Sequence, residues 1–395
     1  MTKVSMYMHV VAFATVVLVC TFTYMEFDQV GQNRPWQLIW NTDRLFKKEV
    51  YMPQFPCVGA IPGEDEDLFC LNRTELLPDY KNPCWKDQND TISCLPYFHL
   101  IGSDKCGSTD LFNRITHHPD VETCSCELGK ESFYWSWFRY GIAHKSMRRH
   151  HKPFADYINM FRKASVSIKA YAVDDYHPKV VGDGTPMDFW DFRGWTRIPQ
   201  NRGLQEPLVL TPHLMRHVYK YMKFLLIFRN PIDRLYSDYY FMKYGRSPES
   251  FHDHVILSVR MMEKCIQENS VRTCMFSTTM YHHLPTRLHI GCYSVFLKEW
   301  LSVFPREDFL ILKTEDYKAN AWGTLSDVFK FLSLPPLNVT AMDKLAQLKK
   351  QHETKSKRNA LDMKNSTRRI LHDFYAEYNK ELADILNDDK FLWET

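Results

Sequence analysis

The sequence predicts an α/β domain whose mostly parallel sheet is flanked by helices, preceded by a transmembrane helix. Short apolar segments that read as strands alternate with helical patterns along the C-terminal part of the chain. Two of these segments end in loops whose residues suit phosphate binding. The 395 residues are 45% hydrophobic and 25% charged, which is typical of a globular protein. The formal net charge of +3 does not indicate a nucleic-acid partner.

The chain begins with a candidate membrane anchor. Residues 4–25 contain no charged side chain, and Lys3 precedes them while Glu26 follows. A helix of roughly 20 apolar residues spans a bilayer, and its basic flank tends to stay in the cytosol. We therefore expect a cytosolic tail at residues 1–3, a signal anchor at residues 4–25 and a lumenal remainder, as in a single-pass type II membrane protein. A cleaved signal peptide is the alternative.

The rest of the chain divides into a predicted stem and a predicted catalytic domain. Residues 26–93 show no sustained helical or strand period and read as a lumenal stem, whereas residues 94–395 read as the packed domain. Ten of the eleven cysteines follow the hydrophobic segment, without the C-x₂-C spacing typical of zinc sites. Disulfides are therefore expected, with their pairing left open. The predicted N-glycosylation sites are Asn72, Asn89, Asn338 and Asn365.

Four apolar runs are the strand candidates of the sheet. They are Tyr97–Ile101, Lys179–Gly182, Lys223–Phe228 and Phe309–Leu312. A helical pattern covers Thr109–His117, and Asn230 followed by Pro231 is a good helix start. Ligands of open parallel sheets bind at the carboxyl ends of the strands, so the loops there are the places to look for chemistry.

The loop after the first run, residues 102–109, joins a strand to a helix through glycine-containing turns. Free N–H groups and the helix dipole favour an anion at such a helix start. A nucleotide triphosphatase loop requires Lys after the second Gly, but here Ser108 follows Gly107 and Lys105 precedes it. The loop therefore suits a phosphate ligand other than an ordinary nucleoside triphosphate, which also argues against a nucleoside kinase.

A second phosphate-binding loop is predicted at residues 229–237. Arg229 lies at the end of the strongly apolar run, and Arg234 and Ser237 share one face of the following helix. Arginine forms bidentate contacts with phosphate, and a serine hydroxyl adds another donor. The alternative for Arg234 is an ion pair with Asp233 or Asp238.

These two loops and their surroundings resemble those of the Golgi carbohydrate sulfotransferases that use 3′-phosphoadenosine 5′-phosphosulfate (PAPS). The matching segments are KNPCW, LPYFHLIGSDKCGSTDLFNRI, the Lys130-Glu131 pair with the aromatic run after it, LIFRNPIDRLYSDYYF, LHIGCYSVFLKEWLSVF and ILHDFYAEYNKELADILNDDKFLW. The resemblance extends from about Lys81 to the C-terminus. It implies a P-loop-like sulfotransferase fold with PAPS as the sulfuryl donor and no metal.

The resemblance also implies roles for individual residues. Lys105 and Glu131 would be catalytic, as the contact to the leaving phosphate and as the base. Donor binding would fall to Lys105, Gly107, Ser108, Thr109, Arg229, Ser237, Lys357 and Arg358. Acceptor binding would fall to Lys130, Asp183, Arg148 and Arg149.

Some of these assignments have plain structural alternatives. The Lys130-Glu131 pair could be a surface ion pair, Asp183 could cap a turn, and the basic run that contains Arg148 and Arg149 could be a solvated face. The expected acceptor is chondroitin or dermatan sulfate, at C6 of N-acetylgalactosamine or its 4-sulfate. A uronic acid or heparan-type acceptor, a glycan-binding protein without catalysis, and the oligomeric state, including a homodimer, stay open.

Overall fold

The computed structural model describes residues 53–59, 66–72, 74–126, 129–142, 151–349 and 361–393. The predicted tail and signal anchor lie outside these residues, as do Arg148, Arg149, Lys357 and Arg358. Within the described ranges, no helix is both long and apolar enough to cross a membrane.

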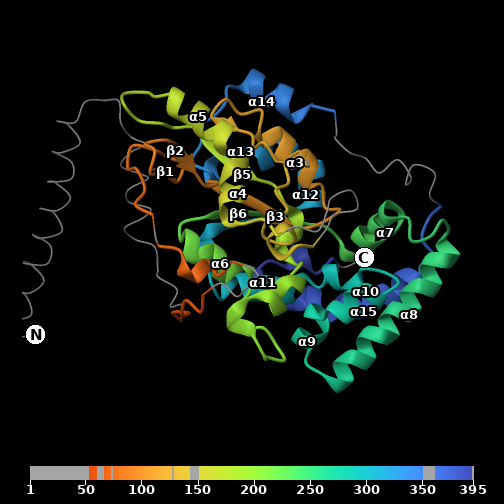
Figure 1. The fold of residues 1–395 in the computed structure, drawn as a ribbon. Helices are drawn as coiled ribbons and strands as arrows, with labels where there is room; N and C mark the ends of the chain where they lie inside the picture. Colours follow the sequence, from red (N-terminus) through yellow and green to blue (C-terminus); the bar gives the residue numbers. More distant parts are fainter. Residues whose placement is uncertain are drawn as a thin grey trace, which may run out of the picture. The chain divides into compact units, whose positions relative to one another are not determined.

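A five-stranded parallel sheet with the order β4-β5-β3-β6-β7 forms the centre of the fold (Figure 1). The strands are β3 (Phe98–Gly102), β4 (Val121–Glu122), β5 (Val180–Asp183), β6 (Lys223–Phe228) and β7 (Phe309–Lys313). The four predicted strands are confirmed. The edge strand β4 has only two residues, too few to show a strand period. Strand β3 lies between β5 and β6, so the chain leaves it toward one edge of the sheet and later returns to build the other.

Both faces of the sheet are buried, as in other parallel sheets. On one face, the ring centroid of Phe98 lies 5.9 Å from that of Phe112 in α3 (Ser108–Ile115). On the other, Phe224 packs 5.1 Å from Trp300 in α11 (Tyr293–Leu301). Alternate residues of the apolar runs thus serve two cores, which explains why the runs are continuous rather than alternating.

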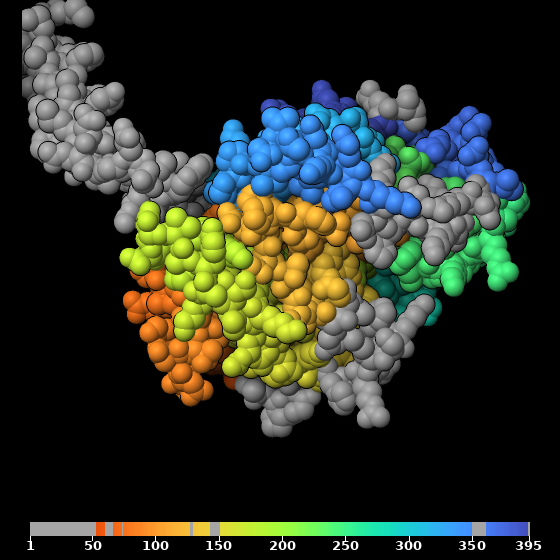
Figure 2. All heavy atoms as spheres, turned by 90° about the horizontal axis from the view of Figure 1, so that it is seen from above, coloured from red at the N-terminus to blue at the C-terminus, as the bar shows by residue number. Residues whose placement is uncertain are grey.

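The remaining helices surround these two cores. They are α4 (Phe154–Met160), α5 (Arg162–Ala170), α6 (Thr211–Val218), α7 (Pro231–Met242), α8 (Pro248–Glu268), α9 (Val271–Phe276), α10 (Thr278–His283), α12 (Thr314–Ala319), α13 (Ala321–Phe331), α14 (Val339–Ala346) and α15 (Asn365–Leu386). Helix α15 packs against α11, α8 and α7. Helix α14 lies beside α3 on the surface seen in Figure 2, where Arg114 donates to the carbonyl oxygens of Ala346 and Leu348.

The packed domain includes described residues of the segment that the sequence predicts as a stem. The short helix η1 (Leu68–Cys70) and the antiparallel strands β1 (Cys84–Lys86) and β2 (Ile92–Cys94) precede the predicted boundary at residue 94. Leu68, Phe69 and Tyr80 are buried in the same core as the sheet. The boundary therefore differs from the prediction, because three-residue strands are too short to show a period in the sequence.

Four disulfides staple the described chain: Cys57–Cys70, Cys84–Cys94, Cys124–Cys126 and Cys265–Cys274. Cys106 and Cys292 are buried free thiols. The expectation of disulfides is thus confirmed.

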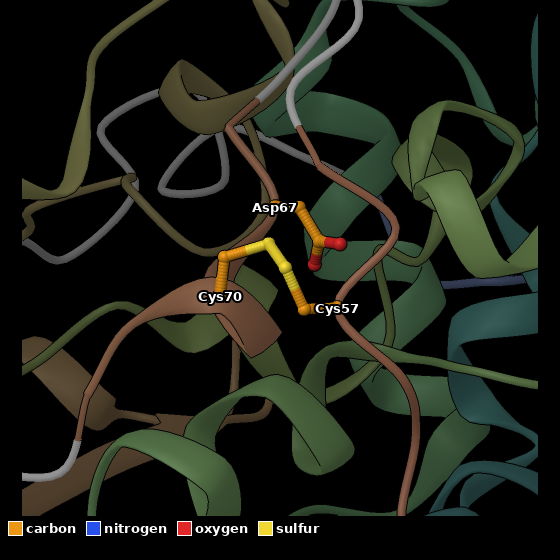
Figure 3. Close-up of side chains that lie close together, drawn as sticks. All are labelled: Cys57, Asp67 and Cys70. Atoms are coloured by element: carbon orange, nitrogen blue, oxygen red, sulfur yellow. A yellow bond between two sulfur atoms is a disulfide. The ribbon is translucent and has the colours of Figure 1, made fainter.

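Asp67 lies beside the first of these disulfides, as Figure 3 shows. Its carboxylate accepts hydrogen bonds from the backbone N–H groups of Val58 (2.8 Å) and Phe69 (3.0 Å). The two sulfurs are bonded to each other and are therefore not thiolate ligands. The Asp67 carboxylate and the disulfide therefore hold residues 57–59 against residues 67–70, rather than forming a metal site.

Candidate active site

Four loops converge at the carboxyl edge of the sheet, because all five strands run in the same direction. Lys105 and Arg229 lie in the loops after β3 and β6. Asp183 is the last residue of β5, and Thr314 begins α12 directly after β7. The chain reverses its direction of strand addition at β3, which is where open α/β sheets bind ligands.

The donor loop, residues 103–107, forms an anion cradle between β3 and α3. Lys105 and Gly107 both have positive φ, at 64° and 97°. Glycine caps the helix without a side chain, so the first N–H groups of α3 stay available to an anion. The Ser103 hydroxyl is buried and has no hydrogen-bond partner among the described residues. These features fit the phosphate groups of a nucleotide donor.

The donor loop is held from behind by the first residues of α12 and α11, Thr314 and Tyr293. The Thr314 hydroxyl lies 2.6 Å from the carbonyl oxygen of Cys106 and 2.9 Å from that of Phe228, so it links the loop to the end of β6. The Tyr293 hydroxyl lies 3.6 Å from the Cys106 sulfur and donates to the carbonyl oxygen of Arg229 at 2.9 Å. Burial raises the pKa of the Cys106 thiol to about 11, which makes it a packing residue rather than a nucleophile.

The Lys105 side chain extends from the donor loop to α7, the helix that begins in the second phosphate-binding loop. Its ammonium lies 3.7 Å from the ring centroid of Phe241 in α7, a cation–π contact. Burial lowers the pKa of Lys105, although Asp238 and Asp104 act in the opposite direction. Arg229 donates to the Lys105 carbonyl oxygen at 3.3 Å, which joins the two loops directly.

A buried network of charges lies beneath Lys105. Asp238 accepts a 2.9 Å hydrogen bond from Arg287 Nε and a second one from Arg287 Nη2, and its Oδ2 lies 3.5 Å from Arg234 Nη1. Arg287 Nη1 also lies 3.9 Å from Asp104. The ion pair that the sequence offers as the alternative role of Arg234 is therefore present, with Asp238 as the partner. Ser237, one residue earlier on α7, is buried as well.

The predicted base, Glu131, lies in a loop that precedes a cluster of buried aromatic residues. Its Oε1 lies 2.8 Å from Lys130 Nζ, and its side chain is 20% exposed. Lys130 also donates to the carbonyl oxygen of Gly184 in the loop after β5. The pKa of Asp104 in the donor loop is raised, chiefly by burial, and the charge of Glu131 contributes to this shift. Lys130 Nζ lies 5.9 Å from the ring centroid of Phe112 in α3, so the base loop (residues 130–133) lies beside the helix that follows the donor loop.

Asp183 lies at the end of β5 and is almost completely buried. Its carboxylate accepts hydrogen bonds from the hydroxyls of Ser132, Thr185 and Tyr157. Burial raises the pKa of Asp183, and the bonds from Ser132 and Thr185 oppose that shift. The structure thus places Asp183 behind the base loop, and its role in acceptor binding stays a prediction.

Two residues that support the site, Thr314 and Arg287, are not predicted from the sequence. Thr314 lies two residues after the predicted strand Phe309–Leu312, so the rule that found the other loops could also have found it. Arg287 lies between α10 and the short helix η6 (Leu288–Gly291), where no pattern in the sequence points to it. The four predicted glycosylation sites are exposed, and glycosylation itself stays a prediction.

Comparison with known proteins identifies the family. A sulfotransferase domain model matches residues 97–383. Carbohydrate sulfotransferase 15 of Rattus norvegicus is 33% identical over 402 residues, which cover 88% of this chain and 71% of that protein. The bifunctional heparan sulfate N-deacetylase/N-sulfotransferase 2 of Homo sapiens is 22% identical over 79% of this chain and 33% of its own length. A solved sulfotransferase from Alicyclobacillus acidocaldarius is 19% identical, with a TM-score of 0.46 over 75% of this chain and 97% of that one. On the domain match and the rat relative, this chain belongs to the sulfotransferase family and is a PAPS-dependent carbohydrate sulfotransferase.

Proposed function

We propose that this enzyme transfers a sulfuryl group from PAPS to a hydroxyl of a glycosaminoglycan, at C6 of N-acetylgalactosamine or its 4-sulfate in chondroitin or dermatan sulfate. One observation supports this reaction: the donor loop and the base loop, which contains Glu131, lie close together at the carboxyl edge of the sheet. An anion cradle and a carboxylate are what transfer to a sugar hydroxyl requires.

The residues of the two phosphate-binding loops divide the work of binding the donor. PAPS would supply the sulfuryl group, and the leaving group would be 3′-phosphoadenosine 5′-phosphate, whose 5′-phosphate oxygen takes the electron pair of the S–O bond that breaks. Gly107, Ser108 and Thr109 would hold the 5′-phosphate at the start of α3, where N–H groups and the helix dipole stabilise negative charge. Arg229 and Ser237 would hold the 3′-phosphate. Lys105 would stabilise the charge that develops on the leaving oxygen.

Glu131 would act on the acceptor hydroxyl. A sugar hydroxyl is a weak nucleophile, and a placed carboxylate that takes its proton contributes about 10²–10⁴ in rate. Glu131 Oε1 lies 2.8 Å from Lys130 Nζ, so the neighbouring ammonium holds the carboxylate in place. The remaining contribution is positional, because transfer requires the acceptor oxygen in line with the bond that breaks.

The proposed acceptor follows from the relatives of this chain. The 33% identity to carbohydrate sulfotransferase 15 supports a carbohydrate acceptor. A heparan-type chain or a uronic acid hydroxyl is the alternative, and the 22% identity to a heparan sulfate N-deacetylase/N-sulfotransferase keeps it under consideration. Arg148 and Arg149 would add a contact surface for a polyanionic chain.

The cellular place that we propose is the Golgi membrane, with residues 4–25 as anchor and the domain in the lumen. Four disulfides support an oxidising compartment.

Sulfate transfer to defined acceptors tests the proposal. The purified protein would be given radiolabelled PAPS with desulfated, 4-sulfated and 6-sulfated chondroitins, dermatan sulfate and heparan sulfate. We expect label at C6 of 4-sulfated N-acetylgalactosamine, lost in Lys105→Ala and Glu131→Gln. Label on heparan sulfate alone would replace the acceptor. Tight PAPS or glycan binding without transfer to any acceptor would favour a glycan-binding protein.

A further inference from the structure

The turn after β5 holds the loop that carries Glu131. Residues 183–185 of this turn contact residues 130–133 through both backbone and side-chain groups. Glu131 lies in the middle of the segment that is held. In the part of the chain that the structure describes, the Glu131 side chain forms no hydrogen bond to the turn, so its position depends on its two neighbours, Lys130 and Ser132.

Asp183 provides the C-terminal half of this support. Its Oδ1 accepts from the Thr185 hydroxyl at 2.7 Å and lies 3.4 Å from the Ser132 backbone nitrogen. Its Oδ2 accepts from the Ser132 hydroxyl and from the Tyr157 hydroxyl at 3.2 Å. A buried carboxylate with this many donors occupies one orientation, because any rotation breaks several bonds at once.

Thr185 extends the support along the base loop. Its hydroxyl oxygen accepts from the backbone N–H of Ser132 at 2.9 Å and lies 3.3 Å from that of Phe133. Phe133 has a positive φ of 52°, so the chain turns sharply just after Glu131. The Thr185 hydroxyl donates a hydrogen bond to Asp183, and its oxygen accepts from the base loop. The donor and acceptor roles of these hydrogen bonds are therefore fixed.

Gly184 and Lys130 provide the N-terminal half. The backbone N–H of Gly184 donates to the Lys130 carbonyl oxygen at 3.0 Å, and the Lys130 ammonium returns a bond to the Gly184 carbonyl oxygen. A β-carbon on Gly184 would lie 2.7 Å from the ring of Phe112 in α3. The turn therefore contacts the helix of the donor loop on one side and the base loop on the other.

We infer that Asp183 is a positioning residue for Glu131, acting through Ser132 and Thr185 rather than by contact with the acceptor. This inference rests on the proposed role of Glu131 as the base. Asp183 holds the backbone on the C-terminal side of the base, while Lys130, bound to Gly184, holds the N-terminal side. Together they fix the carboxylate relative to the donor loop.

A kinetic comparison of Asp183→Asn, Ser132→Ala and Tyr157→Phe tests this inference. The first two remove bonds that hold the base loop, whereas Tyr157→Phe removes a donor to the same carboxylate from α4, outside that loop. We expect kcat to fall by about 10²-fold in Asp183→Asn, as misplacement of a catalytic group does. It should fall less in Ser132→Ala and stay near the wild-type value in Tyr157→Phe. The KM for PAPS should not change in any of them.

Thermal melting of each variant separates position from stability. Equal kcat per folded molecule in all three variants, whatever their loss of stability, would overturn the inference. If Asp183→Asn does not fold, Ser132→Ala against Tyr157→Phe decides the question, because each loses a single hydroxyl.

The variant Glu131→Gln separates the two proposals. If Asp183 acts through Glu131, the kcat of the double variant Asp183→Asn with Glu131→Gln should be no lower than that of Glu131→Gln alone. Additive losses would overturn the positioning role and leave the base in place. Full activity of Glu131→Gln would refute the proposed base itself, and the positioning role with it.

Discussion

Replacement of Asp238 by Asn should destabilise the domain far more than the same replacement elsewhere on α7. Asp238 balances two buried guanidinium groups: Arg287 through two hydrogen bonds and Arg234 at 3.5 Å. Without its charge, the nearest remaining carboxylate to Arg287 is Asp104 at 3.9 Å. Removal of one partner from a buried ion pair costs about 3–5 kcal/mol, because the other charge stays buried and uncompensated.

The control is Asp233→Asn on the first turn of the same helix. Asp233 pairs with Arg368 at 3.1 Å, but both side chains are 39% exposed. An exposed pair contributes about 0–1 kcal/mol, and the position at the helix start adds a similar small term. Urea unfolding measures both variants: with an m value of about 2–3 kcal/mol/M, Asp238→Asn should lower the midpoint by about 1–2.5 M.

Acid conditions provide a second check on the same network. Burial raises the pKa of Asp238, but Arg287 and Arg234 outweigh burial, so the pKa in the folded chain is lowered. The stability that this carboxylate contributes is therefore fully present above its unfolded pKa of about 3.9 and is lost as the pH falls through the folded value. The difference between wild type and Asp238→Asn should shrink below about pH 4. Equal midpoint shifts for Asp238→Asn and Asp233→Asn at neutral pH would refute the reasoning.

Three further predictions follow from the donor loop and the cysteines. Gly107→Ala should cost about 1–2 kcal/mol through its positive φ and weaken PAPS binding in a titration; Gly203→Ala, also at positive φ in open space, should cost a similar amount without changing PAPS affinity. Serine at both Cys84 and Cys94 should lower the free energy of unfolding in urea by about 2–5 kcal/mol, and an unchanged midpoint would contradict the stapling role. Cys106, with its pKa raised to about 11, should resist iodoacetamide at pH 8 in the native enzyme and react after unfolding, as read by mass spectrometry of its peptide.

The central strands and the two phosphate-binding loops could be predicted from the sequence because their signals are local. Residues 224–228 (FLLIF) are a continuous apolar run that is followed by Arg229, and Asn230-Pro231 marks the start of the next helix. The donor loop carries its glycine and lysine within eight residues of the end of β3. Each of these features depends only on neighbours in the chain, so the sequence displays it directly.

The supporting residues could not be predicted because they act across long separations. Arg287 reaches Asp238 from 49 residues away, and Thr314 reaches Cys106 from 208 residues away. Asp183 could be found at the end of a strand, but its partners on the base loop lie about 50 residues earlier. No periodicity or motif links such positions, since the contact exists only once the sheet has formed. The early segment that includes Leu68 and Phe69 escaped prediction because its helix and strands are each only three residues long.

The contact between Gly184 and Phe112 limits the order in which related enzymes can diverge. A larger residue at position 184 meets the ring of Phe112 at 2.7 Å, so it is tolerated only after position 112 has acquired a smaller side chain. If position 184 changes first, the larger side chain pushes the base loop and helix α3 apart. Two residues 72 positions apart in the chain (184 − 112) are thus a pair with strong epistasis, in which a larger side chain at position 184 requires an earlier change at position 112.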